Sequence, residues 1–453
     1  MDAGPLSRNE RIAFWACAAF AAVMRWPARS LTLWDWDEAL FALALRDFDV
    51  SAYHPHPPGF PLFIAAAKLV PLDGFHALQT IVFLSSLFVF PAMFFLARSL
   101  RASAPVAIGA GLLLAFFPNV WFFGGTALSD VPSMVLVVTA CALLLRGNVV
   151  LGAIVLGIAA GFRPQNLLIG LVPFAISVGR ASARPPGGVG GLKPALRLAA
   201  AAIVLAAIVV TTYGTAAALS GGWSAYREVL AGHETYIRTT DSFLAPRHPG
   251  LIQVADDFFF RPYRAMPINA IVTILAATAV VRRKHWLAIA IFGPFCFFAW
   301  LFLDFHSTSR FSIAYMPMFA MLAAAGIPRR GYAAVLAAVT ALMIGWTWPA
   351  LRVVHTTPSP PVAAIEAVRN ARGNLYVDHR LGAHADLLLP ERLRIIVRVA
   401  PPFIEDRDAI LLKEELSAAP GARNFTRERE RLEGIARKRY FETSVIVGRR
   451  PTA

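Results

Sequence analysis

Residues 34–61 read WDWDEALFALALRDFDVSAYHPHPPGFP, and this stretch follows directly on the first hydrophobic segment of the chain. It contains five carboxylates, two histidines and a Pro-Pro-Gly corner. Ionisable groups are costly at membrane depth, so such groups beside a membrane segment are a site hypothesis by default. The stretch therefore predicts a membrane helix that is followed by a functional loop.

The composition is typical of a membrane protein. Of 453 residues, 57% are apolar and only 16% are charged, whereas soluble domains carry roughly 25% charged residues. We expect an all-α polytopic protein with about 11 to 13 membrane helices, because apolar runs long enough to cross a hydrocarbon core recur along the chain. The segment 59–71 is expected to be short or re-entrant. The expected spans are 12–28, 75–97, 105–122, 130–145, 149–162, 164–179, 198–219, 266–281, 286–303, 311–327 and 332–350.

The charged residues carry a topology signal. The net charge is +15, and basic residues cluster between alternate apolar runs while the other loops carry acids. This alternation follows the positive-inside rule and argues against a nucleic-acid surface. It favours outward loops at 29–58 and 220–265. The first apolar run lacks a small-residue cleavage site and is interpreted as an anchor. The three cysteines lie within apolar runs and predict no disulfide framework.

The composition changes after residue 351. A stiff TTPSPP segment is followed by NLYVDH, RIIVRV and TSVIVGRR, which resemble strands, and by VAAIEAVRNA and TRERERLEGIARKRY, which resemble helices. We therefore expect a membrane domain at 1–351 and a small soluble α/β domain at 352–453, on the outer side. The Gly/Pro-rich segment 180–197 is expected to be a flexible inward linker.

The Asp-Glu pair in the first outward loop is the main catalytic candidate. A carboxylate held among apolar and aromatic groups can act as a general base on a hydroxyl. Adjacent helical residues point in different directions, so we expect Asp37 to be the base and Glu38 to orient the acceptor or the neighbouring helix. Asp35 is the second choice for the base, and Asp35 and Trp36 are assigned to the substrate loop. The alternative is a solvated loop with helix-capping acids.

The HPHPPGFP stretch predicts a rigid corner at the membrane surface, since its prolines exclude a helix before Gly59. A histidine in it could donate to a phosphate or bind a divalent ion. His54 and His56 alone do not make a metal site, because further ligands must come from elsewhere. A purely structural corner is the alternative, and it is favoured for His54.

Three cations beyond this loop could bind an anion. Arg163 in GFRPQN separates two short apolar stretches, and DFHSTSRFS places His306 and Arg310 at the outer end of a span. An arginine fork suits a lipid phosphate, so we expect these three residues to form a cationic pocket. A surface turn at Arg163 and interfacial anchoring at 304–312 are the alternatives.

The loop 220–265 mixes aromatic residues with cations. This pattern suits a sugar or a phosphate, but it also suits an interfacial belt. His233 and Arg261 are its candidates for substrate contact. Asp130, in GGTALSDVP, is expected at the outer start of a helix and is interpreted as a cap.

Three of these motifs together resemble those of GT-C glycosyltransferases. They are Asp37-Glu38, then His56-Pro57-Pro58-Gly59, then Ser309-Arg310-Phe311, and they most resemble the bacterial protein-mannosyltransferase and aminoarabinose-transferase-like group. The resemblance covers roughly residues 10–350. Two departures stand out, since His56 replaces a lysine that is common in these relatives and glycine follows Pro-Pro where leucine is usual.

The resemblance implies an inverting glycosyltransferase of the bacterial inner membrane. Its donor would be a sugar on a polyprenyl phosphate, and its acceptor an extracytoplasmic lipid, polysaccharide or protein. Asp37 would be the base, and His56, Arg163 and Arg310 would stabilise the leaving phosphate. No cofactor is required, and a divalent metal is left open. The alternatives are a transporter or lipid flippase without glycosyl transfer, and an inactive relative whose terminal domain binds glycan or partners.

Overall fold

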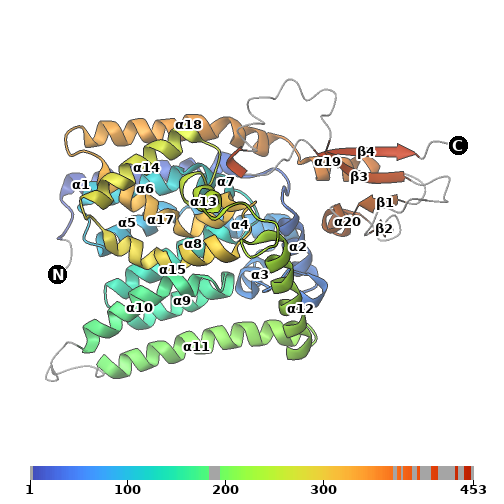
Figure 1. The fold of residues 1–453 in the computed structure, drawn as a ribbon, viewed down its shortest axis with the longest axis horizontal. Coiled ribbons are helices and arrows are strands. Elements are labelled where there is room, and N and C mark those ends of the chain that lie inside the picture. The colour runs from blue at the N-terminus through green and yellow to red at the C-terminus, as the bar shows by residue number, and fades with distance from the viewer. Residues whose placement is uncertain are drawn as a thin grey trace.

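The computed structural model describes residues 4–182 and 194–370, and beyond them 375–378, 381–389, 395–397, 410–416, 434–436 and 443–449 (Figure 1). Most of the expected linker at 180–197 lies outside the described residues. The same holds for the expected helix TRERERLEGIARKRY, of which only residues 434–436 are described.

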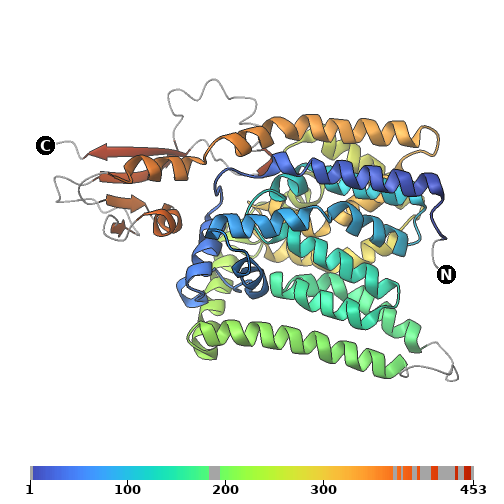
Figure 2. The same cartoon turned by 180° about the vertical axis from the view of Figure 1, so that it is seen from behind.

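A bundle of apolar helices forms the larger part of the molecule (Figures 1 and 2). Its helices are α1 Arg8–Val23, α4 Gly74–Ser86, α5 Val89–Ser99, α6 Ala104–Phe116, α7 Pro118–Phe123, α8 Asp130–Leu145, α9 Val149–Phe162, α10 Asn166–Ser182, α11 Pro194–Leu219, α14 Met266–Val281, α15 Trp286–Phe302, α17 Met316–Gly326 and α18 Tyr332–Thr356. The elements α2 Trp36–Arg46, α3 Pro61–Lys68, α12 Trp223–Tyr236 and α13 Leu251–Ala255 gather at one end of the bundle.

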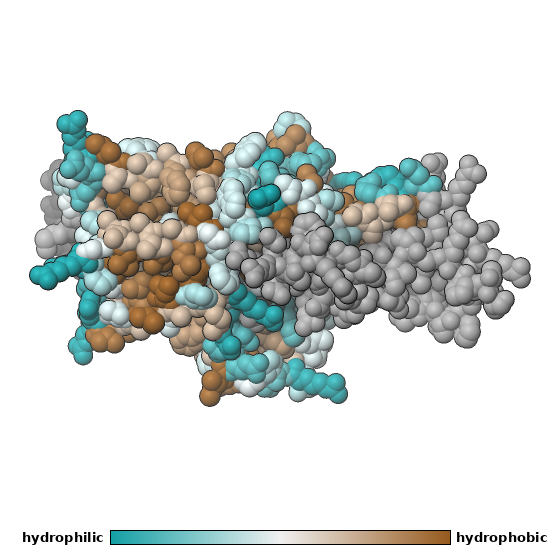
Figure 3. Space-filling view, turned by 90° about the horizontal axis from the view of Figure 1, so that it is seen from above, coloured by the Kyte–Doolittle hydropathy of each residue, from teal (hydrophilic) through white to brown (hydrophobic). Residues whose placement is uncertain are grey.

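The bundle has the surface and the helix lengths of a multi-pass membrane protein. Three described helical stretches are long and apolar enough to cross a bilayer, namely Gly74–Ser99, Leu196–Leu219 and Tyr332–Val368, and six apolar helices are shorter. Apolar side chains such as Ile203, Val210 and Ile274 are exposed. Figure 3 shows apolar residues over the flank of the bundle and hydrophilic residues at its ends. The number of crossings stays a prediction.

Two expected spans are interrupted in the structure. The span expected at 105–122 ends at Phe116, because Phe117 precedes Pro118 and has ψ 128°, which is outside the helical range. The span expected at 311–327 begins instead with α16 Thr308–Phe311 and a 3₁₀ turn, Ser312–Tyr315, before α17. Both interruptions place polar backbone and side chains at the end of the bundle where the acidic loop 29–58 lies.

The acidic loop 29–58 folds into a compact and partly buried unit. Asp35 caps α2, and most of the apolar side chains of α2 are buried against other protein elements. Gly59 has φ +101°, and a Cβ there would lie 2.8 Å from Cγ2 of Val50, so only glycine fits this turn. The following helix, α3, has 8 residues, or about 12 Å, in agreement with the short segment expected at 59–71.

Strands follow α18 and α19 Pro360–Val368. They are β1 Leu375–Asp378, β2 Ile395–Val397, β3 Ile410–Leu416 and β4 Thr443–Arg449, in the sheet order β2-β1-β3-β4. β1 pairs in parallel with β2 and β3, whereas β3 pairs antiparallel with β4. The strands β1, β2 and β4 and the helix α19 were expected from the sequence, but β3 and α20 Gly382–Leu388 were not. A separate C-terminal domain stays a prediction.

Candidate functional site

Arg310 joins two carboxylates that are distant in the sequence. Its Nη1 contacts Oδ2 of Asp37 at the start of α2, and its Nε donates to Oδ2 of Asp130 at 2.8 Å. Asp130 begins α8, and Arg310 lies in α16. The start of α2, the start of α8 and the short helix α16 therefore meet at one guanidinium.

Asp130 extends the contacts to a second arginine. Nη2 of Arg163 lies 2.8 Å from Oδ1 of Asp130, and Nε of Arg163 donates to the Ser129 hydroxyl at 3.1 Å. The Asp130 side chain is only 4% exposed, whereas that of Asp37 is 23% exposed. We call the four residues Asp37, Arg310, Asp130 and Arg163 the charged network. Asp37 is its most exposed member.

The turn that carries Arg310 is held from several sides. The Asn119 side chain of α7 donates to the carbonyl of Ser309 and to the hydroxyl of Ser312, both at 2.9 Å. The Thr308 hydroxyl donates to the carbonyl of Pro262 at 3.1 Å, and the Ser309 hydroxyl donates to the carbonyl of Ile435. These bonds fix the position of the guanidinium. The segment 434–436, near the end of the chain, is one of the supports.

Two histidines lie on the other side of Asp37. Nδ1 of His56 is 3.6 Å from Oδ1 of Asp37, and the rings of His56 and His233 are centred 6.3 Å apart. Burial lowers the pKa of His56 to about 4, although the charge of Asp37 opposes this shift. Burial also lowers the pKa of His233. Both imidazoles are therefore neutral near pH 7. His233 of α12 lies beside His56, and its contact with a substrate stays a prediction.

Glu38 and Asp35 are buried and bond to backbone N–H groups of the loop. The fully buried carboxylate of Glu38 accepts from the backbone N–H groups of Trp34, Asp35 and Ala127, the last at 2.6 Å. Burial raises its pKa to about 7, while the bond from Ala127 opposes the shift. Asp35 accepts from the N–H of Asp37 at 3.0 Å. Of the two roles expected for Glu38, the structure favours holding the segment before α8 over orienting an acceptor.

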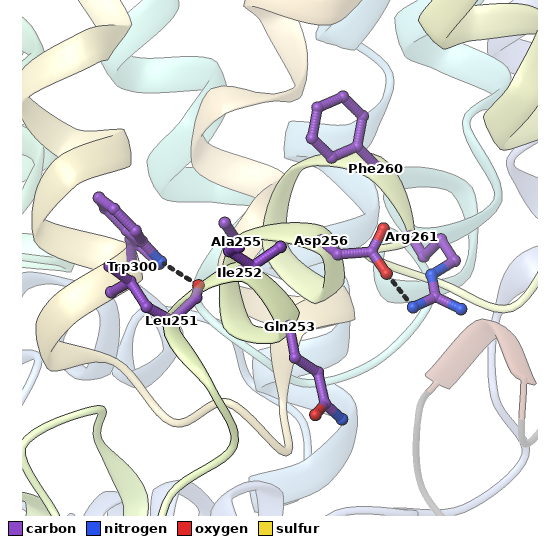
Figure 4. A pocket seen from close by; sticks show the side chains of 8 residues that line it. All are labelled: Leu251, Ile252, Gln253, Ala255, Asp256, Phe260, Arg261 and Trp300. Carbon is purple, nitrogen blue, oxygen red and sulfur yellow. Dashed lines mark hydrogen bonds and ion pairs between the residues drawn. The ribbon is translucent and has the colours of Figure 1, made fainter.

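Several other predicted residues lie apart from the network. His306 is exposed beside Asp304, so the expected pocket of three cations is corrected to two arginines. Arg261 pairs with Asp256 and lines a separate groove with Leu251, Phe260 and Trp300 (Figure 4).

The remaining predicted residues are His54 and Trp36. His54 pairs through its backbone with Asp49, at 2.7 and 2.8 Å. Trp36 is 36% exposed, and its ring centre lies 6.4 Å from that of His384. Among the described residues, no group of three or more His, Cys, Asp or Glu side chains is arranged to hold a metal ion, so His54 and His56 gain no further ligand of these types there.

The contacts of Asp130 with two arginines were not predicted from the sequence. An acid at the first position of an apolar helix has an ordinary explanation as a cap, and nothing near it in the sequence indicates two arginine partners. Its partners are 33 and 180 residues away. The signal that could have found it is the retention of a charge where the surrounding residues are almost all apolar.

Comparison with known proteins places the fold. No protein-family model matches the chain, and no curated protein sequence matches it. ArnT from Cupriavidus metallidurans bound to undecaprenyl phosphate has a TM-score of 0.54 at 15% identity, with 87% of each chain covered. Its apo structure has a TM-score of 0.51 at 15% identity, covering 85% of this chain and 86% of that one.

A third solved structure is the archaeal oligosaccharyltransferase AglB from Archaeoglobus fulgidus, in complex with an inhibitory peptide and a dolichol-phosphate. Its TM-score is 0.48 at 11% identity, covering 97% of this chain and 65% of that one. The two ArnT structures carry the assignment of fold. The chain therefore has a GT-C-like membrane fold, as the motifs of its outward loops predicted.

Proposed function

We propose that the protein is an inverting glycosyltransferase that moves a sugar from a polyprenyl phosphate to an acceptor hydroxyl. The observation that carries the proposal is the charged network. In it a partly exposed carboxylate, Asp37, contacts the buried Arg310, and Asp130 joins Arg310 to a second arginine at the loop end of an apolar bundle. The likeness in fold to a protein solved with undecaprenyl phosphate supports a lipid-linked donor. The proposed location is a bacterial inner membrane, with the site on the outer side.

The reaction needs one base and one stabilised leaving group. Asp37 takes the proton of the acceptor hydroxyl as its oxygen forms a bond to the anomeric carbon. The bond between that carbon and the phosphate oxygen breaks, and its electron pair stays on polyprenyl phosphate. A single displacement of this kind inverts the anomeric configuration. General-base catalysis typically contributes about 10²–10⁴-fold to the rate.

The two arginines are suited to the leaving phosphate. Their guanidinium groups are held by Asp130 and provide preformed donors where negative charge develops. Burial lowers the pKa of Arg310, but Asp130 and Asp37 raise it well above its ordinary value, so Arg310 stays cationic. His56 is neutral and can donate one hydrogen bond to the same phosphate or to the sugar. The donor panel described next distinguishes a hexose from a pentose.

The test uses purified protein in nanodiscs and a panel of labelled polyprenyl-phosphate sugars. Released polyprenyl phosphate, measured by mass spectrometry, is expected for the wild type with one class of donor and is expected to disappear in Asp37→Asn. The exposed Asp47 of the same loop supplies the matched control, Asp47→Asn. Release that persists in Asp37→Asn would remove Asp37 as the base. No release with any donor and acceptor would contradict glycosyl transfer.

A further inference from the structure

The charged network contains as many anions as cations. Arg310 contacts Asp37 and Asp130, and Arg163 contacts Asp130, so two guanidinium groups face two carboxylates. A donor phosphate that enters this network therefore finds both arginines already paired. Its charge is best matched if one carboxylate gives up its place.

We propose that Asp37 occupies the position on Arg310 that a donor phosphate oxygen takes, so that donor binding releases Asp37 and makes it available as the base. This inference rests on the proposed function. It assigns two states to Asp37, one paired with Arg310 before the donor binds and one turned toward the acceptor afterwards. It also orders the reaction, because the acceptor meets a free base only after the donor is bound.

Asp37 is the carboxylate suited to exchange, and Asp130 is not. Asp130 is 4% exposed and bonded to two arginines at 2.8 Å each. Removing it from them would leave buried charges uncompensated, which is strongly unfavourable. Asp37 is 23% exposed, contacts Arg310 through Oδ2, and has a neutral His56 at 3.6 Å from Oδ1. It can therefore leave Arg310 while remaining beside water and a polar partner.

The exchange also accounts for a base that starts in an ion pair. An arginine in contact with a carboxylate favours its ionised form, so the carboxylate takes up a proton less readily. A phosphate can pair with guanidinium in a fork, as a carboxylate does, so it can take the place of Asp37 on Arg310. Once the phosphate holds Arg310, the displaced carboxylate regains its basicity. The resting site thus keeps its base paired with Arg310 until a donor is present.

A binding experiment without chemistry tests the exchange. Radiolabelled undecaprenyl phosphate, which carries no sugar, is titrated into nanodiscs that contain the wild type, Asp37→Asn, Asp37→Ser or Asp47→Asn. If Asp37 competes with the phosphate, Asp37→Asn and Asp37→Ser should bind it about 5- to 150-fold more tightly than the wild type, the usual range for coupling between two sites. Asp47→Asn removes the same charge from the same loop and should bind like the wild type. Arg310→Gln should bind more weakly.

The outcomes separate the exchange from the proposed function. Tight binding by the wild type, with equal or weaker binding by both Asp37 variants, would overturn the exchange and leave a phosphate site at the arginines intact. If Asp47→Asn strengthened phosphate binding as much as the Asp37 variants, the effect would come from the loss of any negative charge. This result would also overturn the exchange. Absence of binding to the wild type, together with no release of polyprenyl phosphate from any donor, would overturn the proposed function and the exchange together.

Discussion

Two arginines that contact aspartates, Arg310 and Arg261, have opposite surroundings. Arg310 reaches Asp37 across 273 residues of sequence and Asp130 across 180, and its side chain is 7% exposed. Arg261 reaches Asp256 within its own segment, and its side chain is 44% exposed, beside the apolar groove of Figure 4. The residue types are the same. The contacts of Arg310 are buried and join distant elements, whereas the Arg261–Asp256 pair is local and partly exposed to solvent.

This difference shows why residue type alone does not identify a site. An exposed ion pair contributes little, because water screens it and both side chains lose freedom to form it. A buried pair is costly to form and costly to break, so its members hold each other in one geometry. The charged network has that property and the Arg261–Asp256 pair lacks it. The following predictions test the contrast, beginning with the largest expected effect.

Asp37→Asn should reduce the rate of glycosyl transfer by about 10²–10⁴-fold, since the amide cannot take up the acceptor proton. The measurement is single-turnover release of polyprenyl phosphate at saturating donor. Thermal unfolding in detergent should stay close to that of the wild type, because the amide keeps the shape of the side chain. A slow variant that has also lost its fold would fail this control.

Asp130→Asn should reduce transfer by about 10²-fold, because misplaced arginines no longer meet the leaving group. It should also destabilise the fold by about 3–5 kcal/mol, the usual cost of breaking a buried pair. Transfer and thermal unfolding are measured on the same preparation. A wild-type transfer rate together with wild-type stability would show that the charged network does not depend on Asp130.

Ser309→Ala should lower stability by about 1–3 kcal/mol, because it leaves the buried carbonyl of Ile435 without its hydroxyl donor. Its effect on transfer should be smaller than that of Asp130→Asn, since Asn119 still holds the carbonyl of Ser309. Thermal unfolding measures the change, with Ser51→Ala, at an exposed position of the first loop, as the matched control. Equal stability of the two variants would mean that residues 434–436 do not support the turn that carries Arg310.

His56→Gln should weaken the dependence of stability on pH between about 6.5 and 4. Burial lowers the pKa of His56 from 6.5 to about 4. Between these values the unfolded state binds a proton that the folded state does not, so stability falls as the pH falls through this window. Glutamine does not titrate. The midpoint of thermal unfolding, plotted against pH, should therefore change less steeply between these two pH values. An unchanged slope would mean that His56 is not buried in its neutral form.

Arg261→Gln should change the free energy of unfolding by no more than about 0.5 kcal/mol, as is usual for surface substitutions. The transfer rate should stay at the wild-type level, because the pair is exposed and outside the charged network. Rates at low and saturating donor are the measurement. A large rise in KM would place the groove of Figure 4 on the path of a substrate and remove the contrast between the two pairs.

Much of the site was predictable because its motifs are local in the sequence. Asp37, His56, Arg163, His233 and Arg310 were each singled out from their neighbours, and the structure brings all five together. His306 and Arg261 have equally suggestive neighbours and lie elsewhere. Short motifs indicate which side chains have chemistry to offer, but they do not say which of them face one another.

The sequence by itself determined the membrane class, the ends of most helices and the position of the acidic loop. These depend on hydrophobic length, proline and charge, which act along the chain and can be read in order. Only the tertiary structure decided that Asp130 joins two arginines, that Glu38 is used in holding backbone N–H groups, and that Asp37 rests on Arg310. Contacts between residues so far apart depend on how the helices pack, and packing depends on the shapes of all the side chains at once.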